Sequence, residues 1–121
     1  MSCLEEKDTG LEPFNAPKPQ LELIRKKQYG PYKLDAINSV PVNFLNTLDI
    51  TGGNSGSACL NGKGQLVGLL FDGVYESIIG DWDFDDNLNR AIAVDTRYML
   101  WVMTYLDQAT NLLREMNIVD E

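Results

Sequence analysis

The chain has 121 residues, enough for one domain of ordinary size, and its hydrophobic fraction of 44% is typical of a globular protein. Its net charge of −8, from 18 acidic and 10 basic residues, argues against nucleic acid as a partner, because phosphate binding needs clustered Lys and Arg. No apolar run approaches the roughly 18 residues of a membrane span, and the polar, acidic start of the sequence lacks the features of a signal peptide.

The first segment, residues 1–20, is predicted to be a poorly ordered lead-in. Its composition is polar, and Pro13, Pro17 and Pro19 are expected to prevent a helix there.

A short helix is predicted to follow the lead-in, over residues 21–28. Leu21 and Ile24 would lie on one face, and Gly30 would stop the helix. Residues 30–39 are then predicted to form a loop.

Three short strands are predicted next, over residues 41–46, 57–60 and 65–71. Residues 61–64 read Asn-Gly-Lys-Gly and predict a hairpin, because Asn-Gly readily adopts positive φ. The run from 66 to 71 is almost continuously apolar, which predicts burial on both faces of that strand.

Residues 74–88 are predicted to be a long acidic loop with one helical turn. The loop lacks the Asp-x-Asp-x-Asp-Gly spacing and the late glutamate of an EF-hand, so a solvated loop is favoured over a calcium site. Trp82 and Phe84 are predicted to anchor the loop to the rest of the fold.

The last strand is predicted over residues 90–94, and helices follow it. Asp95 is a suitable N-cap for the next helix, whose residues 98–103 are apolar on nearly every side and predict burial against a barrel or a second domain. A shorter amphipathic helix is predicted over residues 111–117.

Two cysteines, Cys3 and Cys59, match no metal-ligand spacing, and no metal site is predicted. Cys59 lies within a predicted strand. It is therefore interpreted as a small buried hydrophobic residue and not as a reactive thiol.

The segment between the first two strands, residues 52–57, reads Gly-Gly-Asn-Ser-Gly-Ser and is the most informative feature of the chain. A nucleophilic serine must stand exposed on a tight turn, which glycines permit. The N–H groups of Gly53 and Ser55 could then bind a developing oxyanion. A plain hairpin connection explains the same residues, and the chain has 0 histidines, so it cannot complete a Ser-His-Asp triad.

A longer stretch of sequence narrows these alternatives. It reads TGGNSGSACL from Thr51 to Leu60, followed by NGKGQLVGLLFDG, GDWDFD and NRAIAVDTRYMLWVM in order. These blocks resemble the C-terminal end of the bacterial dipeptidyl-peptidase seven and eleven family, serine exopeptidases with a trypsin-like double β-barrel and an added helical domain. The resemblance covers residues 30–119.

The resemblance implies roles for four residues. Ser55 would be the nucleophile, and the backbone N–H of Gly53 would belong to the oxyanion hole. Asp72 matches an aspartate that holds the free α-amino group of the substrate, although Asp-Gly at the end of a strand is also a common structural junction. Gly73 matches the position that is arginine in members cleaving after acidic residues, so glycine implies apolar residues at P1, the residue before the cleaved bond.

The sequence departs from related patterns at two places. Asn54 stands where digestive trypsin-like enzymes have aspartate, so we expect neutral hydrogen bonds to hold the turn, without a buried N-terminal amine. Residues 57–59 read Ser-Ala-Cys where the family usually has Ser-Pro-Val, which affects fine geometry but removes no catalytic group.

The expected architecture is mainly β with C-terminal α: part of the second barrel of a trypsin-like double β-barrel, followed by a buried helix. Residues 1–40 would link from an upstream helical domain, 41–94 would form the partial barrel, and 95–121 the C-terminal helices. The resemblance implies a peptide substrate, an upstream part of the same enzyme that supplies His and Asp, a homodimer, no cofactor, and a periplasmic or cell-surface location.

Two other functions stay open at this point. A trypsin-like endopeptidase would not use Asp72 to bind an amine. A non-catalytic interaction module could keep the fold without the chemistry, which the lack of histidine favours if the 121 residues are the whole polypeptide.

Overall fold

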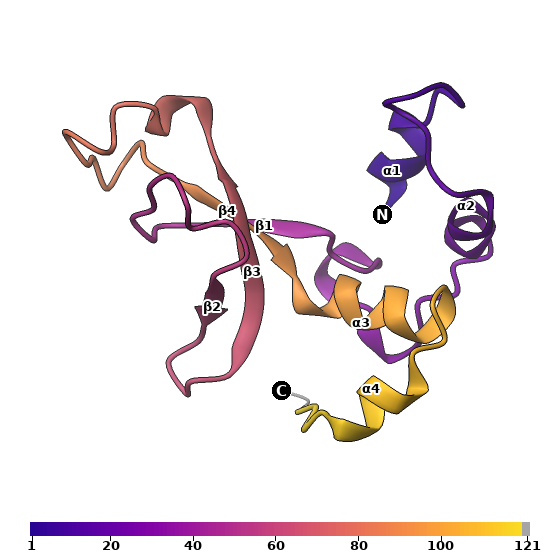
Figure 1. The fold of residues 1–121 in the computed structure, drawn as a ribbon. Helices are drawn as coiled ribbons and strands as arrows, with labels where there is room; N and C mark the ends of the chain where they lie inside the picture. The colour runs from indigo at the N-terminus through magenta and orange to yellow at the C-terminus, as the bar shows by residue number, and fades with distance from the viewer. Residues whose placement is uncertain (120–121) are drawn as a thin grey trace. The chain divides into compact units, whose positions relative to one another are not determined.

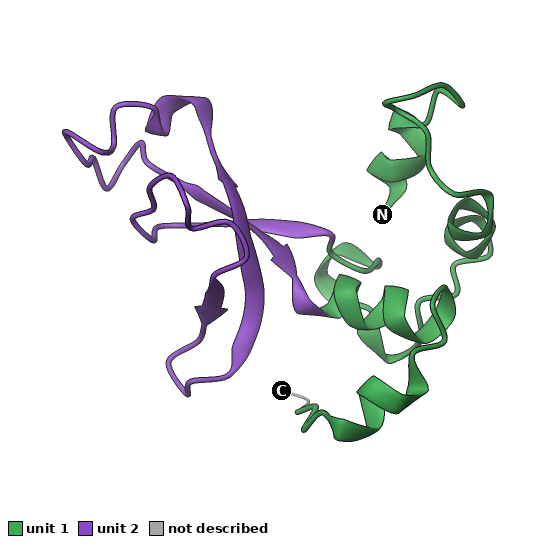
Figure 2. Cartoon of the chain, viewed as in Figure 1, with its two compact units in different colours: residues 1–41, 97–121 green, residues 42–96 purple. Residues whose placement is uncertain are grey.

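The computed structural model of the chain describes residues 1–119, which form two compact units (Figure 2). One unit is Val42–Thr96, and the other combines Met1–Pro41 with the part of the chain from Arg97 onward. No helix in the described residues is both long and apolar enough to cross a bilayer.

The unit Val42–Thr96, unit 2 in Figure 2, is a four-stranded antiparallel sheet (Figure 1). Its strands are β1 (Asn43–Asn46), β2 (Ala58–Leu60), β3 (Leu66–Gly73) and β4 (Ala91–Asp95). They lie in the order β1-β4-β3-β2. The four predicted strands are therefore confirmed, and the sheet followed by C-terminal helices confirms the predicted fold class.

Small and apolar side chains form the core of the sheet unit. Its buried members are Cys59, Leu70, Ala91 and Ala93, and Phe44, Ile50 and Val67 pack against them. Cys59 is 5% exposed, which confirms that it is a buried residue. The hairpin between β2 and β3 also forms as predicted, although its left-handed residue is Gly64 and not Gly62.

The prediction that β3 is buried on both faces is wrong. Leu66 and Phe71 are 47% and 48% exposed, whereas Gly68 and Leu70 are buried. Within the described residues, only one face of the strand is closely covered, so the apolar run alternates in exposure despite its composition.

A β-bulge interrupts β3 just before the candidate site. Leu70 pairs with Ala93, but Asp72 pairs with the next residue of β4, Ile92, so Phe71 is the extra residue. Residues directly opposite in an antiparallel pair share a face. Gly73, which pairs with Ala91, is therefore on the same face as Leu70, three residues before it.

The loop from β3 to β4 contains one 3₁₀ turn, η3 (Tyr75–Ser77), as predicted. The prediction that Trp82 anchors the loop is wrong, because its side chain is 92% exposed. Hydrogen bonds hold the loop base instead: Ser77 Oγ accepts from the N–H of Arg90 at 2.9 Å and donates to the Arg90 carbonyl at 3.3 Å.

The other unit, unit 1 in Figure 2, is helical and contains four α-helices and two 3₁₀ turns in the described residues. They are α1 (Ser2–Lys7), α2 (Lys18–Arg25), η1 (Gly30–Tyr32), η2 (Asp35–Ile37), α3 (Thr96–Tyr105) and α4 (Thr110–Glu115). The prediction that residues 1–20 contain no helix is wrong. Pro19 lies in the first turn of α2, where its missing N–H has no intrahelical partner to lose.

Helices α2 and α3 pack through aromatic and amide groups. Leu21 and Ile24 are buried on one face of α2, as predicted. Trp101 of α3 is fully buried, and its Nε1 donates to the Gln28 carbonyl at 2.8 Å. Residues 98–103 are otherwise half-buried, and α2 ends at Arg25, before the expected stop at Gly30.

Candidate active site

The turn before β2 is closed by hydrogen bonds around Asn54. Its side-chain Oδ1 accepts from the N–H of Thr51 at 2.7 Å, its N–H donates to the Thr51 carbonyl at 3.2 Å, and its carbonyl accepts from Ser57 at 2.9 Å. Gly53 and Gly56 have φ of 98° and 85°, conformations that other residues rarely adopt. The neutral hydrogen bonds expected at Asn54 are thus present.

Ser55 lies exposed on this turn, between the two left-handed glycines. Its Oγ donates a long hydrogen bond, 3.4 Å, to the carbonyl of Phe71, the bulged residue of β3. The next N–H, of Gly56, donates to the Leu70 carbonyl at 2.7 Å. These hydrogen bonds attach the turn to β3 at the residues that directly precede Asp72 and Gly73.

The backbone donors proposed for an oxyanion hole are available. Neither the N–H of Gly53 nor that of Ser55 donates a hydrogen bond to another of the described residues. A positive φ at Gly53 also orients its peptide in a way that a side chain would oppose. Their role in oxyanion binding stays a prediction.

Asp72 and Gly73 occupy the end of β3. Asp72 is exposed, and its Oδ1 accepts from the N–H of Gly73 at 2.8 Å. A Cβ atom at Gly73 would lie 3.7 Å from Ser77 Cβ and 3.8 Å from Ile50 Cδ1, which is ordinary contact. The bulge therefore points position 73 toward Ile50 and the loop that contains Ser77.

The four residues predicted from the sequence line one hollow of about 300 Å³. They are Gly53, Ser55, Asp72 and Gly73. Sequence reasoning missed other residues of the lining, among them Ile50, Val74, Ser77, Ile78 and Asp81. A candidate nucleophile and a candidate substrate pocket thus share one concave surface of the sheet unit.

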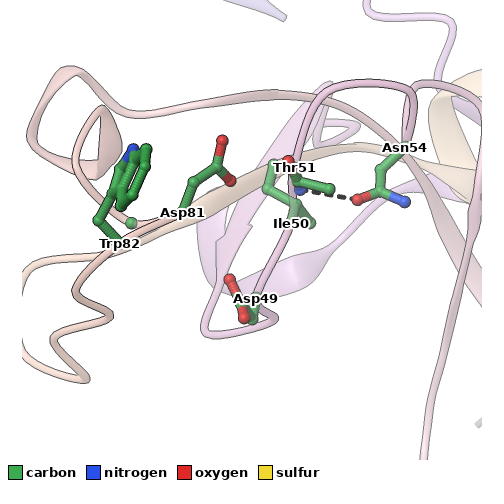
Figure 3. Close-up of a pocket in the computed structure, with 7 residues that line it drawn as sticks. Asp49, Ile50, Thr51, Asn54, Asp81 and Trp82 are labelled. Atoms are coloured by element: carbon green, nitrogen blue, oxygen red, sulfur yellow. Dashed lines mark hydrogen bonds between the residues drawn. The ribbon is translucent and has the colours of Figure 1, made fainter.

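A second hollow, of about 520 Å³, adjoins the first and shares Ile50, Thr51, Asn54 and Asp81 with it. Figure 3 shows its lining, with Asp81 between Trp82 and Ile50 in this view and the Thr51–Asn54 hydrogen bond drawn as a dashed line. Asp49 and Gly80 complete the lining.

The two hollows are acidic. Asp49, Asp72 and Asp81 contribute carboxylates, and among the described residues no Lys or Arg side chain lines either hollow. The chain contains 0 histidines, so a Ser-His-Asp triad that included Ser55 would need a histidine from outside these residues. The described part of the chain also has no group of three or more His, Cys, Asp or Glu side chains able to hold a metal ion.

Comparison with known proteins gives one family for almost the whole chain. The family model described as Peptidase S46 matches residues 2–118. The chain is 46% identical over 118 residues to dipeptidyl-peptidase 7 of Capnocytophaga gingivalis, covering 98% of the chain. It is 44% identical over 134 residues to the Asp/Glu-specific dipeptidyl-peptidase of Shewanella putrefaciens, covering 93% of the chain.

A solved structure has the same fold. The chain superposes on Porphyromonas endodontalis DPP11, crystallised in complex with the dipeptide Arg-Asp, with a TM-score of 0.91 and 32% identity over 97% of the chain. The chain spans 16% to 18% of the length of these relatives.

Proposed function

The chain belongs to the peptidase S46 family, and on that premise we propose that it carries the nucleophile and the P1 pocket of a serine dipeptidyl aminopeptidase. One observation supports this more than any other. Ser55, Asp72 and Gly73 line the same hollow, although they come from a turn and from the end of a strand. A nucleophile, a carboxylate for an amine and an open pocket are the groups that an aminopeptidase needs together.

In the proposed reaction, Ser55 Oγ attacks the carbonyl carbon of the second residue of a peptide. Its proton passes to a histidine base, which an aspartate orients, and both would come from an upstream part of the same enzyme. The oxyanion accepts hydrogen bonds from the N–H groups of Gly53 and Ser55. The amine product leaves with the proton, and water then releases the dipeptide from Ser55.

Asp72 is proposed to set the length of the released fragment. This exposed residue lines the hollow, and its Oδ1 already accepts a hydrogen bond from the Gly73 N–H. An ion pair with the cationic α-amino group would fix the peptide N-terminus at a constant distance from Ser55. Peptides would then be cut two residues from the N-terminus.

Gly73 is proposed to favour apolar P1 residues. It leaves room at the sheet end of the hollow, and Ile50, Val74 and Ile78 supply apolar surface there. An arginine at this position would present a guanidinium for a substrate carboxylate. The family also suggests a trypsin-like barrel completed by upstream residues, a homodimer, no cofactor and a periplasmic or cell-surface location.

Fluorophosphonate labelling, read by intact mass, tests the nucleophile. It is best done on a chimera in which this chain replaces the matching segment of C. gingivalis dipeptidyl-peptidase 7, since that protein supplies the upstream residues. We expect stoichiometric label and release of dipeptides, both lost in Ser55→Ala, with a drop in kcat of about 10³-fold or more.

Ser57→Ala is the matched control, because Ser57 is an exposed serine of the same turn, and its hydrogen bonds to Asn54 and Leu70 are made through its backbone. It should label and cleave as the parent does. A folded chimera that is labelled in Ser55→Ala, or in no variant, would refute the nucleophile assignment. Labelling the purified chain alone would show whether it carries an assembled site by itself.

A further inference from the structure

We propose that Asp81 is a second determinant of P1 selectivity. Its carboxylate would disfavour acidic P1 side chains in the hollow and would allow cationic P1 side chains to bind there as well as apolar ones. This inference rests on the proposed function and names the substrate class of the same site. The preferred peptides would carry, as their second residue, an apolar side chain or one with an apolar stem and a positive end, such as lysine.

The position of Asp81 is the first reason. It lines the hollow that contains Ser55 and Gly73, and it also lines the adjoining hollow, so it lies at their junction. Figure 3 shows the Asp81 side chain among residues of that shared lining. A side chain that enters past Gly73 therefore approaches a carboxylate as it extends.

The walls along that path are the second reason. Ile50, Val74 and Ile78 are apolar, and Gly73 and Ser77 are small. The volume of about 300 Å³ lies at the lower end of the range of small-molecule pockets. Such a hollow suits one unbranched side chain, whose methylene groups contact the isoleucines while its end reaches a polar group.

The charge balance is the third reason. Asp72 would be occupied by the substrate α-amino group, which leaves Asp81 and Asp49 without a substrate cation when P1 is apolar. The nearest arginine in sequence, Arg90, is held elsewhere: its Nη1 donates to the carbonyls of Asp86 and Asn89 at 2.8 Å and 2.6 Å. An acidic P1 side chain would thus meet carboxylates and no basic partner among the described lining residues.

This arrangement predicts that Gly73→Arg alone cannot create full specificity for acidic P1 residues. The new Cβ fits, because its neighbours Ser77 Cβ and Ile50 Cδ1 lie at 3.7 Å and 3.8 Å. The guanidinium would enter the hollow that Asp81 lines and pair with that carboxylate. Only removal of the Asp81 charge would leave the arginine free for a substrate carboxylate.

The test compares four forms of the chimera described above: the parent, Asp81→Asn, Gly73→Arg and the double variant. Fluorogenic dipeptide amides with one common first residue and Lys, Leu or Asp at P1 report kcat/KM. We expect Asp81→Asn to lower the Lys value about tenfold, to raise the Asp value about tenfold, and to change the Leu value by less than about twofold. The double variant should cleave after Asp about tenfold better than Gly73→Arg does.

Asp83→Asn is the matched control, because Asp83 is an exposed aspartate of the same loop that lines neither hollow. It should leave all three values unchanged. The inference would be overturned if the ratios of kcat/KM among the Lys, Leu and Asp substrates were the same in the parent and in Asp81→Asn. If hydrolysis still depended on Ser55, the proposed function would remain intact.

A chimera that is folded by circular dichroism can also be tested by binding of the product dipeptides, measured by calorimetry. Affinities that follow the same order as the predicted kcat/KM values would support the role of Asp81 even where turnover is slow. Asp81→Asn should then weaken the binding of the dipeptide that ends in Lys. A folded chimera that neither cleaves nor binds any dipeptide would overturn the proposed function, and this inference with it.

Discussion

The ring of Phe44 packs directly on Gly68 at the centre of the sheet. A Cβ atom at Gly68 would lie 2.8 Å from Phe44 Cε1 and 2.7 Å from the carbonyl oxygen of Val94. Real Cβ atoms essentially never approach other atoms so closely. Gly68 pairs with Cys59 on one side and Asp95 on the other, so this contact joins β1 to the strands that carry the candidate site.

Gly68→Ala should therefore destabilise the sheet unit. The alanine methyl would overlap a backbone carbonyl, which cannot move without disturbing the β3–β4 pairing. We therefore expect the free energy of unfolding of the sheet unit to fall by about 2 kcal/mol or more. Hydrogen exchange of β3 and β4 amides in the chimera measures this local stability. Gly62→Ala is the control, since nothing lies within 4 Å of its Cβ position, and unchanged β3 protection in Gly68→Ala would contradict the packing argument.

Asn54 should matter to catalysis through the shape of the turn and not through charge. Its Oδ1 accepts from the Thr51 N–H at 2.7 Å, a role that an aspartate carboxylate can also fill. We expect Asn54→Ala to lower kcat about 10- to 100-fold with a small change in KM, and Asn54→Asp to stay within about fivefold of the parent. Steady-state kinetics of the chimera would contradict this if the aspartate variant lost as much as the alanine variant.

Substitution of Asp72 distinguishes an aminopeptidase from an endopeptidase. If its exposed carboxylate binds the α-amino group, Asp72→Asn should lower kcat/KM for dipeptide amides with a free N-terminus about 100-fold. The same substrates with an acetylated N-terminus should be cleaved poorly by parent and variant alike. Efficient cleavage of the acetylated substrates by the parent would identify an endopeptidase instead.

The strands and the glycine-rich turn before β2 could be predicted because their signals are local. Short apolar runs on either side of the Asn-Gly-Lys-Gly turn specify β2, the hairpin and β3 by short-range geometry. Gly53 and Gly56 do adopt the left-handed conformations that the turn sequence indicates. These features depend on a few neighbouring residues, which a single sequence displays fully.

The bulge at Phe71 and the loop residues of the hollow could not be predicted in this way. Alternation alone would have put Gly73 on the face opposite Leu70, and the register shift that reverses it depends on pairing with β4. Asp81 reaches the hollow through a long loop whose path no periodicity fixes. The size of Trp82 predicts an anchor, but the path of the same loop leaves this residue exposed.

Tyr98 provides a test of the helical unit by pH. Burial raises the pKa of the Tyr98 phenol above the usual value of about 10, and the hydrogen bond that Gln20 Nε2 donates to its oxygen, 2.7 Å long, opposes this rise. The phenol is also stacked on Trp101, with ring centroids 6.2 Å apart. Its protonated form is thus held more firmly in the folded than in the unfolded chain.

The sign of the stability effect follows from that difference. The pKa of Tyr98 is higher in the folded than in the unfolded chain. Its contribution to the free energy of unfolding is therefore complete below about pH 10 and is lost as the pH rises through the folded pKa. The absorbance of tyrosinate, recorded as the parent minus Tyr98→Phe, should show a midpoint above about 10. Gln20→Leu should raise the midpoint further, because it removes the donor that favours the phenolate.

At neutral pH, Tyr98→Phe should also cost about 1 to 2 kcal/mol, since the buried amide of Gln20 loses its acceptor. A tyrosinate midpoint at or below about 10 for Tyr98 would mean that its phenol is in water, and the packing of α2 against α3 would then be incorrect.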